Sequence, residues 1–234
     1  MRARSKFVAI ALATHLPQTL AMVAVATIGS YLLGSSGGQI LLVALAVLSG
    51  QVSVGWSNDY IDSKVDKQLN RPDKPVVRDQ LDPRELLLPI ALALIAVVPL
   101  SFLAAGFIGG AAHLLAVASA WGYNLFLSRT KWSWLPYTVS FALLMVFLFQ
   151  AASTTFWPAP LVLLVAALVG VIAHLLNALP DIDRDVASGV GGLAVSLGKR
   201  ASWWLTAVIA ALTVLTLWFA LQAPLVLTLL SPAA

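Results

Sequence analysis

The sequence predicts an all-α membrane protein, a bundle of seven full transmembrane helices with a short C-terminal stub. Three observations predict this fold class: the composition, a series of long apolar runs, and the placement of the charges. The 234-residue chain is 60% hydrophobic and 10% charged, with a mean hydropathy of +0.91. A soluble domain carries about 25% charged residues, so this chain has too little polar surface to cover a water-soluble globule. It has no cysteine, which excludes disulfides and thiol chemistry.

The apolar runs define the expected helices, because a spanning helix needs about 20 apolar residues. The first run follows basic residues, as in a signal peptide, but it continues to Leu33 and is therefore predicted to span. A last apolar piece, Leu225–Leu230, is too short to cross. The predicted spans are 9–33, 39–58, 86–105, 110–127, 135–153, 159–178 and 203–222.

The charges predict the topology. All fourteen basic residues lie before the first run or on every second connection, and the other connections and the C-terminus carry none. By the positive-inside rule the charged side, with the N-terminus, is cytoplasmic and the C-terminus lies outside. All ten acidic residues share the cytoplasmic side. The net charge of +4 is therefore explained by membrane topology, and we expect no nucleic-acid partner.

The long charged connection between the second and third runs has recognisable turn and capping signals. Asn70–Pro75 is a basic segment rich in turn residues. Asp82, Pro83 and Glu85 match an N-cap, a proline in the first turn and a glutamate at N3, which predicts that the third helix begins there. No linker separates two domains, so residues 1–234 are predicted to form a single membrane domain.

An acidic cluster closes the second apolar run. If that helix continues, Asn58, Asp62 and Asp66 are spaced i, i+4, i+8, and Asp59 lies three residues before Asp62, so all four share one face. Helix rise places this cluster at the cytoplasmic boundary of the hydrocarbon core, because residue 58 lies about 27 Å along the axis from residue 40.

A second cluster closes the sixth run with the same spacing. Asn177, Asp181 and Asp185 repeat i, i+4, i+8, whereas Asp183 points elsewhere. Pro180 lacks an amide donor and is predicted to kink the helix. The two clusters lie at the same predicted depth and side, so they are expected to face each other.

Carboxylate clusters of this kind suit Mg²⁺, which keeps waters and takes one or two carboxylates plus substrate phosphates. Two facing clusters can hold two Mg²⁺ ions with a diphosphate between them, and nearby basic residues complete an anion site. The simpler alternative is that these aspartates are solvated helix ends. The matched spacing, depth and side of the two clusters favour the metal site. The basic residues expected there are Lys64, Lys67, Arg71, Lys74, Arg129 and Lys131.

These motifs resemble those of the UbiA superfamily of intramembrane prenyltransferases. The clusters that begin at Asn58 and Asn177 resemble the first and second aspartate motifs of that family. The basic segment 70–75 resembles the Arg-Pro segment after the first motif, and 191–198 resembles the segment after the second. Tyr123, followed by Arg129 and Lys131, resembles the family's Tyr/Lys element.

The resemblance implies a central cavity that opens at the cytoplasmic side. It also implies Mg²⁺-dependent transfer of a prenyl group from a prenyl diphosphate donor to a hydrophobic acceptor, aromatic or lipid-like, within the membrane. Asp62 and Asp181 are then the expected catalytic residues. The implied ligands of two Mg²⁺ ions are Asn58, Asp59, Asp62, Asp66, Asn177, Asp181 and Asp185, and the implied diphosphate-binding residues are Arg71, Lys74, Tyr123, Arg129 and Lys131.

Two features depart from the family pattern. Family members usually have nine helices, so seven and a stub imply that the last two are absent from this sequence. Arg78-Asp79-Gln80 also stands where many members carry a glycine-containing turn. Neither departure touches the aspartate motifs.

Two other functions remain open from the sequence. A terpene cyclase on the same scaffold captures the carbocation within the substrate and needs no acceptor. A cation or phosphate transporter is the third candidate, although transporters place their sites near the membrane midplane. The histidines, His15, His113 and His174, have no spacing typical of a metal site, and their roles are not assigned.

Overall fold

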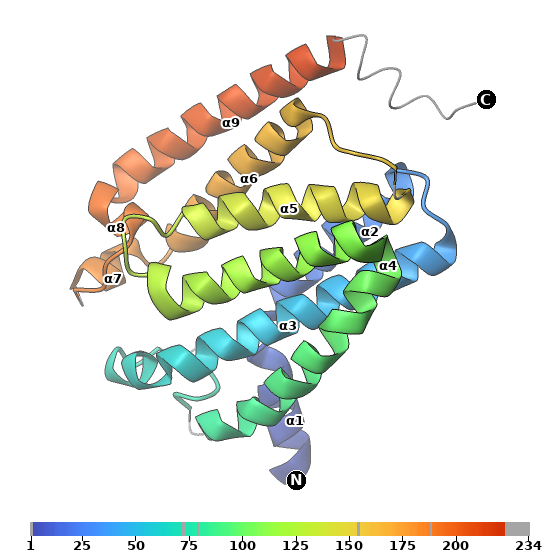
Figure 1. Cartoon of the computed structure of the whole chain (residues 1–234). Helices are drawn as coiled ribbons and strands as arrows, with labels where there is room; N and C mark the ends of the chain where they lie inside the picture. The colour runs from blue at the N-terminus through green and yellow to red at the C-terminus, as the bar shows by residue number, and fades with distance from the viewer. Residues whose placement is uncertain (1, 72–73, 79, 154, 188, 223–234) are drawn as a thin grey trace.

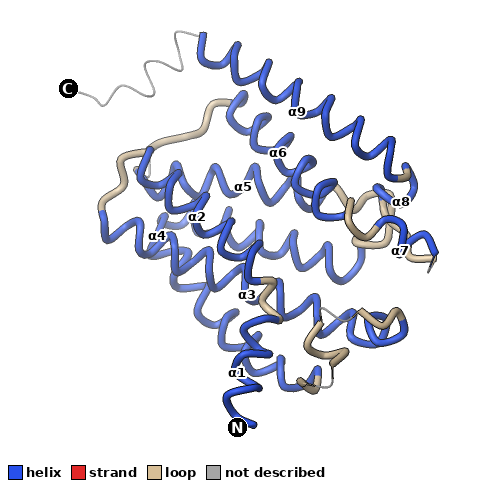
Figure 2. The backbone as a smooth tube through the Cα atoms, turned by 180° about the vertical axis from the view of Figure 1, so that it is seen from behind, coloured by secondary structure: helices blue, strands red, loops and turns tan. Residues whose placement is uncertain are grey.

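The computed structural model describes residues 2–71, 74–78, 80–153, 155–187 and 189–222, and these ranges contain helices and no strand. The predicted stub at 225–230 lies outside the described residues. The helices pack as neighbours in a bundle (Figures 1 and 2). The main helices are α1 (Arg2–Leu12), α2 (Leu16–Leu32), α3 (Gly37–Gln68), α4 (Leu87–Gly122), α5 (Leu135–Ala152), α6 (Pro160–Ala178), α7 (Ile182–Ala187), α8 (Leu193–Leu197) and α9 (Lys199–Gln222).

The all-helical membrane fold is confirmed, but seven separate spans are not. The described residues contain five helical segments long and apolar enough to cross a membrane, or six if the bent pair formed by α1 and α2 counts as one span. The predicted runs 135–153, 159–178 and 203–222 correspond to α5, α6 and α9. The difference from seven comes from the first run and from the third and fourth.

The first run, predicted as one helix over 9–33, is broken between α1 and α2. The two helices meet at an angle of 58°. His15 lies at the break with φ 54° and ψ 56°, in the left-handed region that costs a side-chain-bearing residue about 1–2 kcal/mol. Pro17 follows in the first turn of α2, where its missing amide is tolerated. The physical reason for the break is therefore local, at residues 13–17.

The third and fourth runs are joined in α4. A straight helix of 36 residues would be about 54 Å long, well beyond the hydrocarbon core of about 30 Å. The backbone leaves helical geometry at Ala105 and Gly106, where Gly106 has φ 64° and ψ −166°, and the chain reverses direction there (Figure 1). The two arms are tied by a hydrogen bond of 2.7 Å between Ser101 Oγ and His113 Nδ1.

The predicted start of this segment is confirmed in detail. The side chain of Asp82 accepts a hydrogen bond from the Arg84 amide at 2.8 Å, and the Asp82 amide donates to Glu85 Oε2 at 2.9 Å. This reciprocal capping box opens a short 3₁₀ turn, Pro83–Leu86, that leads into α4. Glu85 also pairs with Lys6 of α1, which ties the N-terminal helix to the same end of the bundle.

The bundle has two chemically different ends. The C-terminal part of α3, together with α7 and α8, lies at the left of Figure 1, and Figure 2 shows the same grouping from behind. The described residues of the uncharged connections, 33–36, 153 and 155–159, lie at the opposite end. The separation of charged and uncharged connections predicted from the sequence is thus present in the fold, and the charged end holds both acidic clusters.

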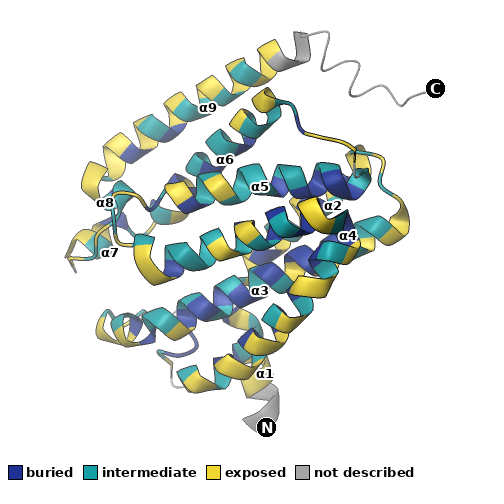
Figure 3. Ribbon diagram, viewed as in Figure 1, coloured by how far each residue is buried: buried dark blue, intermediate teal, exposed yellow. Residues whose placement is uncertain are grey.

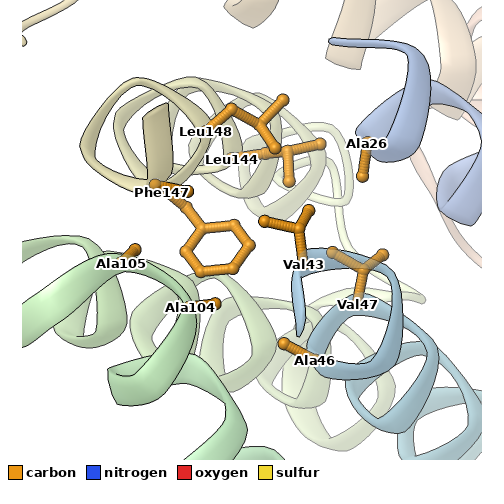
Figure 4. Close-up of a cluster of buried hydrophobic side chains, with 10 residues drawn as sticks. Ala26, Val43, Ala46, Val47, Ala104, Ala105, Leu144, Phe147 and Leu148 are labelled. Atoms are coloured by element: carbon orange, nitrogen blue, oxygen red, sulfur yellow. The ribbon is translucent and has the colours of Figure 1, made fainter. Parts of the chain in front are cut away.

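The interior at the uncharged end is closely packed. Phe147 of α5 is fully buried against Val43 of α3 and the small residues Ala104 and Ala105 of α4 (Figure 4). Large apolar side chains such as Phe107, Leu88 and Trp204 are exposed instead. Figure 3 shows exposed positions on the outward faces of the helices. An apolar outer surface is expected where lipid replaces water around the bundle.

Gly55 of α3 provides a test of the packing around the α1–α2 break. A Cβ atom at Gly55 would lie 2.5 Å from the Thr14 carbonyl oxygen, which is backbone and cannot turn aside. We expect Gly55→Ala to lower the apparent Tm in detergent, with overpacking costing about 1–3 kcal/mol. Gly122→Ala is the matched control, because its Cβ would meet nothing within 4 Å. Equal melting of both variants would contradict the close approach.

Candidate active site

A cavity of about 800 Å³ extends from the charged end into the bundle and is lined by both acidic clusters. Its inner walls are largely apolar and include Met22, Val47 and Leu144. Val47 precedes Asp62 by fifteen residues on α3, which corresponds to about 22 Å along the helix axis. The cavity therefore joins a charged region to an apolar region within one elongated space.

The first cluster forms as predicted for three of its four members. α3 continues through the cluster, and Asn58, Asp62 and Asp66 all line the cavity. The Asn58 amide donates to Asp62 Oδ2 at 3.1 Å, and Arg129 Nη2 donates to Asp62 Oδ1 at 2.6 Å. The expected common face is thus confirmed for these three residues.

Asp59 departs from that expectation. Its side chain is fully buried and does not line the cavity. Its Oδ1 atom accepts a hydrogen bond from Lys74 Nζ at 2.5 Å and lies 3.0 Å from His15 Nε2. The implied role of Asp59 as a metal ligand remains a prediction, and its contacts favour an anchoring role for the lysine instead.

The second cluster lies at a helix break. α6 ends at Ala178, Pro180 occupies the turn and α7 begins at Ile182, so the predicted kink at Pro180 is confirmed as an interruption. The cavity is lined by Asn177, Asp181 and Asp185. Asp183 is exposed and pairs with Lys199 at 2.9 Å, pointing away from the cavity as predicted.

Arg71 joins the two clusters. Its Nη2 atom donates to Asp185 Oδ1 at 2.8 Å, and its Nη1 atom lies 3.2 Å from Asp66 Oδ1. Burial opposes the charged guanidinium, but the carboxylates of Asp66, Asp185 and Asp181 outweigh it and raise the pKa of Arg71, which keeps it charged. The pKa of Asp185 is raised overall, because burial and the Asp181 carboxylate, which raise it, outweigh Arg71, which lowers it. The expected face-to-face arrangement of the clusters is therefore present and is held by one guanidinium.

The remaining predicted anion-binding residues are placed unequally. Lys74, Tyr123 and Arg129 line the cavity together with Arg71. Lys131 is exposed and is not among the lining residues, so the structure does not bring it to the site. Arg129, two positions earlier, takes the place beside the first cluster.

The carboxylates suit a hard divalent cation. Within the described ranges, no three His, Asp or Glu side chains converge as a preformed metal cage. Mg²⁺ does not require one, because it is bound through one or two carboxylates plus substrate phosphates and water. Both oxygens of buried Asp66 and the Nε atom of Arg71 lack a hydrogen-bond partner among the described residues. These unsatisfied groups, with Asp62, Asp181 and Asp185 lining the same cavity, fit an ion and an anionic substrate.

Sequence reasoning missed several polar residues of the cavity. Asn124 donates to Val54 O and to Ser57 Oγ, both at 2.9 Å, and Tyr137 Oη accepts from Asn177 Nδ2 at 3.3 Å. Both residues flank the charged connection 128–134 in the sequence. Because that connection is expected at the same membrane depth as the two clusters, this neighbourhood could have pointed to them. His15 is 44 residues from its partner Asp59, so spacing gave no signal for it.

The chain matches the UbiA prenyltransferase family model over residues 7–234 and belongs to that family. A digeranylgeranylglyceryl phosphate synthase from Methanopyrus kandleri is 30% identical over 213 residues, which cover 86% of this chain and 74% of that protein. The enzyme of the same name from Archaeoglobus fulgidus is 33% identical over 169 residues, covering 69% of this chain and just over half, 56%, of the relative.

Solved structures show the same fold. A UbiA homologue from Archaeoglobus fulgidus bound to DMAPP and Mg²⁺ matches with a TM-score of 0.75 at 16% identity, covering 92% of this chain and 78% of that one. A UbiA homologue from Aeropyrum pernix matches with a TM-score of 0.67 at 19% identity, covering 88% of this chain and 79% of that one. The all-helical fold and the family predicted from the aspartate motifs are therefore both confirmed.

Arg71→Gln tests the bridge between the clusters. We expect a clear fall in apparent Tm, because a charge-assisted hydrogen bond contributes about 1.5–3 kcal/mol and Asp66 would be left buried without its cation. Lys199→Gln is the control. Its partner Asp183 is 74% exposed, and exposed ion pairs contribute little. Melting curves in one detergent compare the two, and an Arg71→Gln curve that overlays the Lys199→Gln curve would rule out a structural bridge.

Proposed function

We propose that this protein transfers a prenyl group from a prenyl diphosphate to a hydrophobic acceptor within the membrane, with Mg²⁺ as the cofactor. The observation that carries the proposal is the shape and lining of one cavity. Two aspartate motifs face each other across Arg71 at its charged end, and the cavity continues from there into an apolar part. A substrate with a diphosphate head and an isoprenoid tail matches both parts. Membership of the UbiA prenyltransferase family supports the same conclusion.

The residues divide into two roles at the charged end. Asn58, Asp62 and Asp66 on one side, and Asn177, Asp181 and Asp185 on the other, offer oxygen ligands for one ion each. Bound Mg²⁺ supplies positive charge that favours departure of the diphosphate. Arg71 keeps the unpartnered Nε donor for a diphosphate oxygen, and Arg129 retains further guanidinium donors while it holds Asp62.

The apolar part of the cavity holds the isoprenoid and excludes water. An allylic carbocation is left when the carbon–oxygen bond to the diphosphate breaks, and water would capture it. The rings of Tyr123, Tyr137 and His174 lie together near Asn177, with centroid separations of 5.2–6.1 Å. Electron-rich faces stabilise nearby positive charge. We place this charged end on the cytoplasmic side of the membrane, following the predicted topology.

We propose a lipid-like acceptor. The relatives described above are named digeranylgeranylglyceryl phosphate synthases, a name that denotes a glycerol phosphate lipid carrying two geranylgeranyl groups. An acceptor of that class would present a hydroxyl oxygen to the allylic cation, form a carbon–oxygen bond and lose the hydroxyl proton. The aromatic rings and charged groups described above would stabilise the allylic cation in the same way whichever nucleophile attacks it.

The aspartate motifs are tested by paired substitutions. Asp62→Asn and Asp181→Asn should each reduce Mg²⁺-dependent diphosphate release by about 10²-fold or more, because each removes a carboxylate that would hold the Mg²⁺ whose positive charge offsets the negative charge developing on the diphosphate. Asp183→Asn is the matched control on the same segment, since its side chain points away to Lys199. Release is measured with a coupled diphosphate assay on purified protein in lipid. Wild-type rates in both motif variants would refute the proposed site.

The acceptor is tested by product analysis. Protein in lipid is incubated with geranyl, farnesyl or geranylgeranyl diphosphate, with a prenylated glycerol phosphate, an aromatic acid or no acceptor. We expect a mass increase of the glycerol phosphate lipid by one prenyl unit, measured by mass spectrometry. A prenylated aromatic acid would overturn the lipid acceptor but not prenyl transfer, whereas a cyclic product without any acceptor would establish the terpene cyclase alternative.

A further inference from the structure

Lys74 is buried beside three polar side chains. Its Nζ atom donates to Asp59 Oδ1 at 2.5 Å and to Asn58 Oδ1 at 3.1 Å, and it lies 3.0 Å from His15 Nε2. Lys74 is 8% exposed. The lysine is therefore fixed by the protein through these two hydrogen bonds.

His15 holds the Asp59 carboxylate. Its Nε2 atom lies 3.0 Å from Asp59 Oδ1, and because a carboxylate oxygen only accepts, we assign the Nε2 proton to this hydrogen bond. Of the three side chains around the Lys74 ammonium, His15 comes from outside α3, whereas Asn58 and Asp59 are consecutive on that helix. It is also the residue with φ 54° at the α1–α2 break. The break carries the backbone to within close reach of α3, where Gly55 leaves no side chain against Thr14.

The lysine transmits this arrangement to the first aspartate motif. Lys74 donates to Asn58 Oδ1, and the Asn58 amide nitrogen donates to Asp62 Oδ2 at 3.1 Å. The hydrogen-bond chain His15–Asp59–Lys74–Asn58–Asp62 fixes which way the Asn58 amide faces and the rotation of the Asp62 carboxylate. Buried hydrogen-bonded chains of this kind restrict each member to one orientation.

We propose that His15 is a positioning residue: from the helix break it holds the Asp59 carboxylate that anchors the Lys74 ammonium, and through Lys74 and Asn58 it orients the Asp62 carboxylate at the cavity wall. The catalytic part of this proposal rests on the function proposed above, and the structural part does not. His15 contacts no reacting group in this scheme. Its left-handed backbone directs the imidazole at Asp59.

The test separates the backbone from the side chain. His15→Gly keeps the left-handed conformation, which glycine adopts without strain, and removes the imidazole that holds Asp59. His15→Gln keeps an N–H donor at a similar reach from the backbone. Asn70→Gly is the backbone control, because Asn70 has φ 48° and no cap or contact in this chain of hydrogen bonds. All are compared as full-length protein in the same detergent and lipid.

The first readout does not depend on turnover. An amine-reactive reagent is applied and modification of Lys74 is measured by mass spectrometry, with exposed Lys131 as the internal reference. Lys74 should be protected in the wild type, in His15→Gln and in Asn70→Gly, and modified several-fold faster in His15→Gly. Apparent Tm is recorded alongside, and we expect His15→Gly to melt within a few degrees of the wild type.

The second readout is steady-state prenyl transfer. Outer contacts to a metal site typically contribute 10–100-fold to activity, so kcat of His15→Gly should fall by about tenfold or more with little change in KM for the donor. His15→Gln should recover most of this loss. Wild-type Lys74 protection and kcat in His15→Gly would overturn the proposal, as would a His15→Gln variant that behaves like His15→Gly. Absence of prenyl transfer in the wild type would refute the proposed function, while the Lys74 measurement would still decide the role of His15.

Discussion

Neutralising five carboxylates at the end of an apolar bundle is the constraint on which this structure depends. Asp59, Asp62 and Asp66 come from α3, Asp181 from the turn after α6 and Asp185 from α7. Like charges that are brought together in this way repel. Lys74, Arg129 and Arg71 each form an ion pair with at least one of them. Two of these cations come from the connection after α3, so the chain that leaves the first motif returns to neutralise it.

This constraint explains why the charged end is built from interrupted helices. The cations that pair with these carboxylates lie outside the long helices, because Arg71 and Lys74 follow α3 and Arg129 precedes α5. The break at His15 brings its side chain to the first cluster from the N-terminal side. The uncharged end has no such requirement and is closed by packing of Phe147 against alanines and valines. The proposed site and the irregular backbone therefore lie at the same end of the fold.

Features fixed by local chemistry were predictable from the sequence. The capping box at Asp82 depends on neighbouring residues, the interruption at Pro180 depends on a missing amide, and the alignment of Asn58, Asp62 and Asp66 depends on helix periodicity. The reversal at Gly106 lies between the predicted runs 86–105 and 110–127. The break at His15 was not predicted, because an apolar run looks the same in a sequence whether the helix is straight or bent. The Arg71 bridge spans 114 residues, a contact that tertiary packing alone determines.

Asp59 shows most clearly where periodicity stops being sufficient. Asp59 and Asp66 are seven residues apart, so they project within about 20° of each other, separated by about 10 Å along the axis. Direction alone would assign both to the cavity, yet Asp66 lines it and Asp59 does not. The difference is depth: at the level of Asp59 the α1–α2 break brings in His15 and the connection brings in Lys74. Residues on one face of a helix can therefore have different surroundings at different depths, because different segments pack against each level. In this way one motif can line the proposed substrate site with some residues and anchor that site with another.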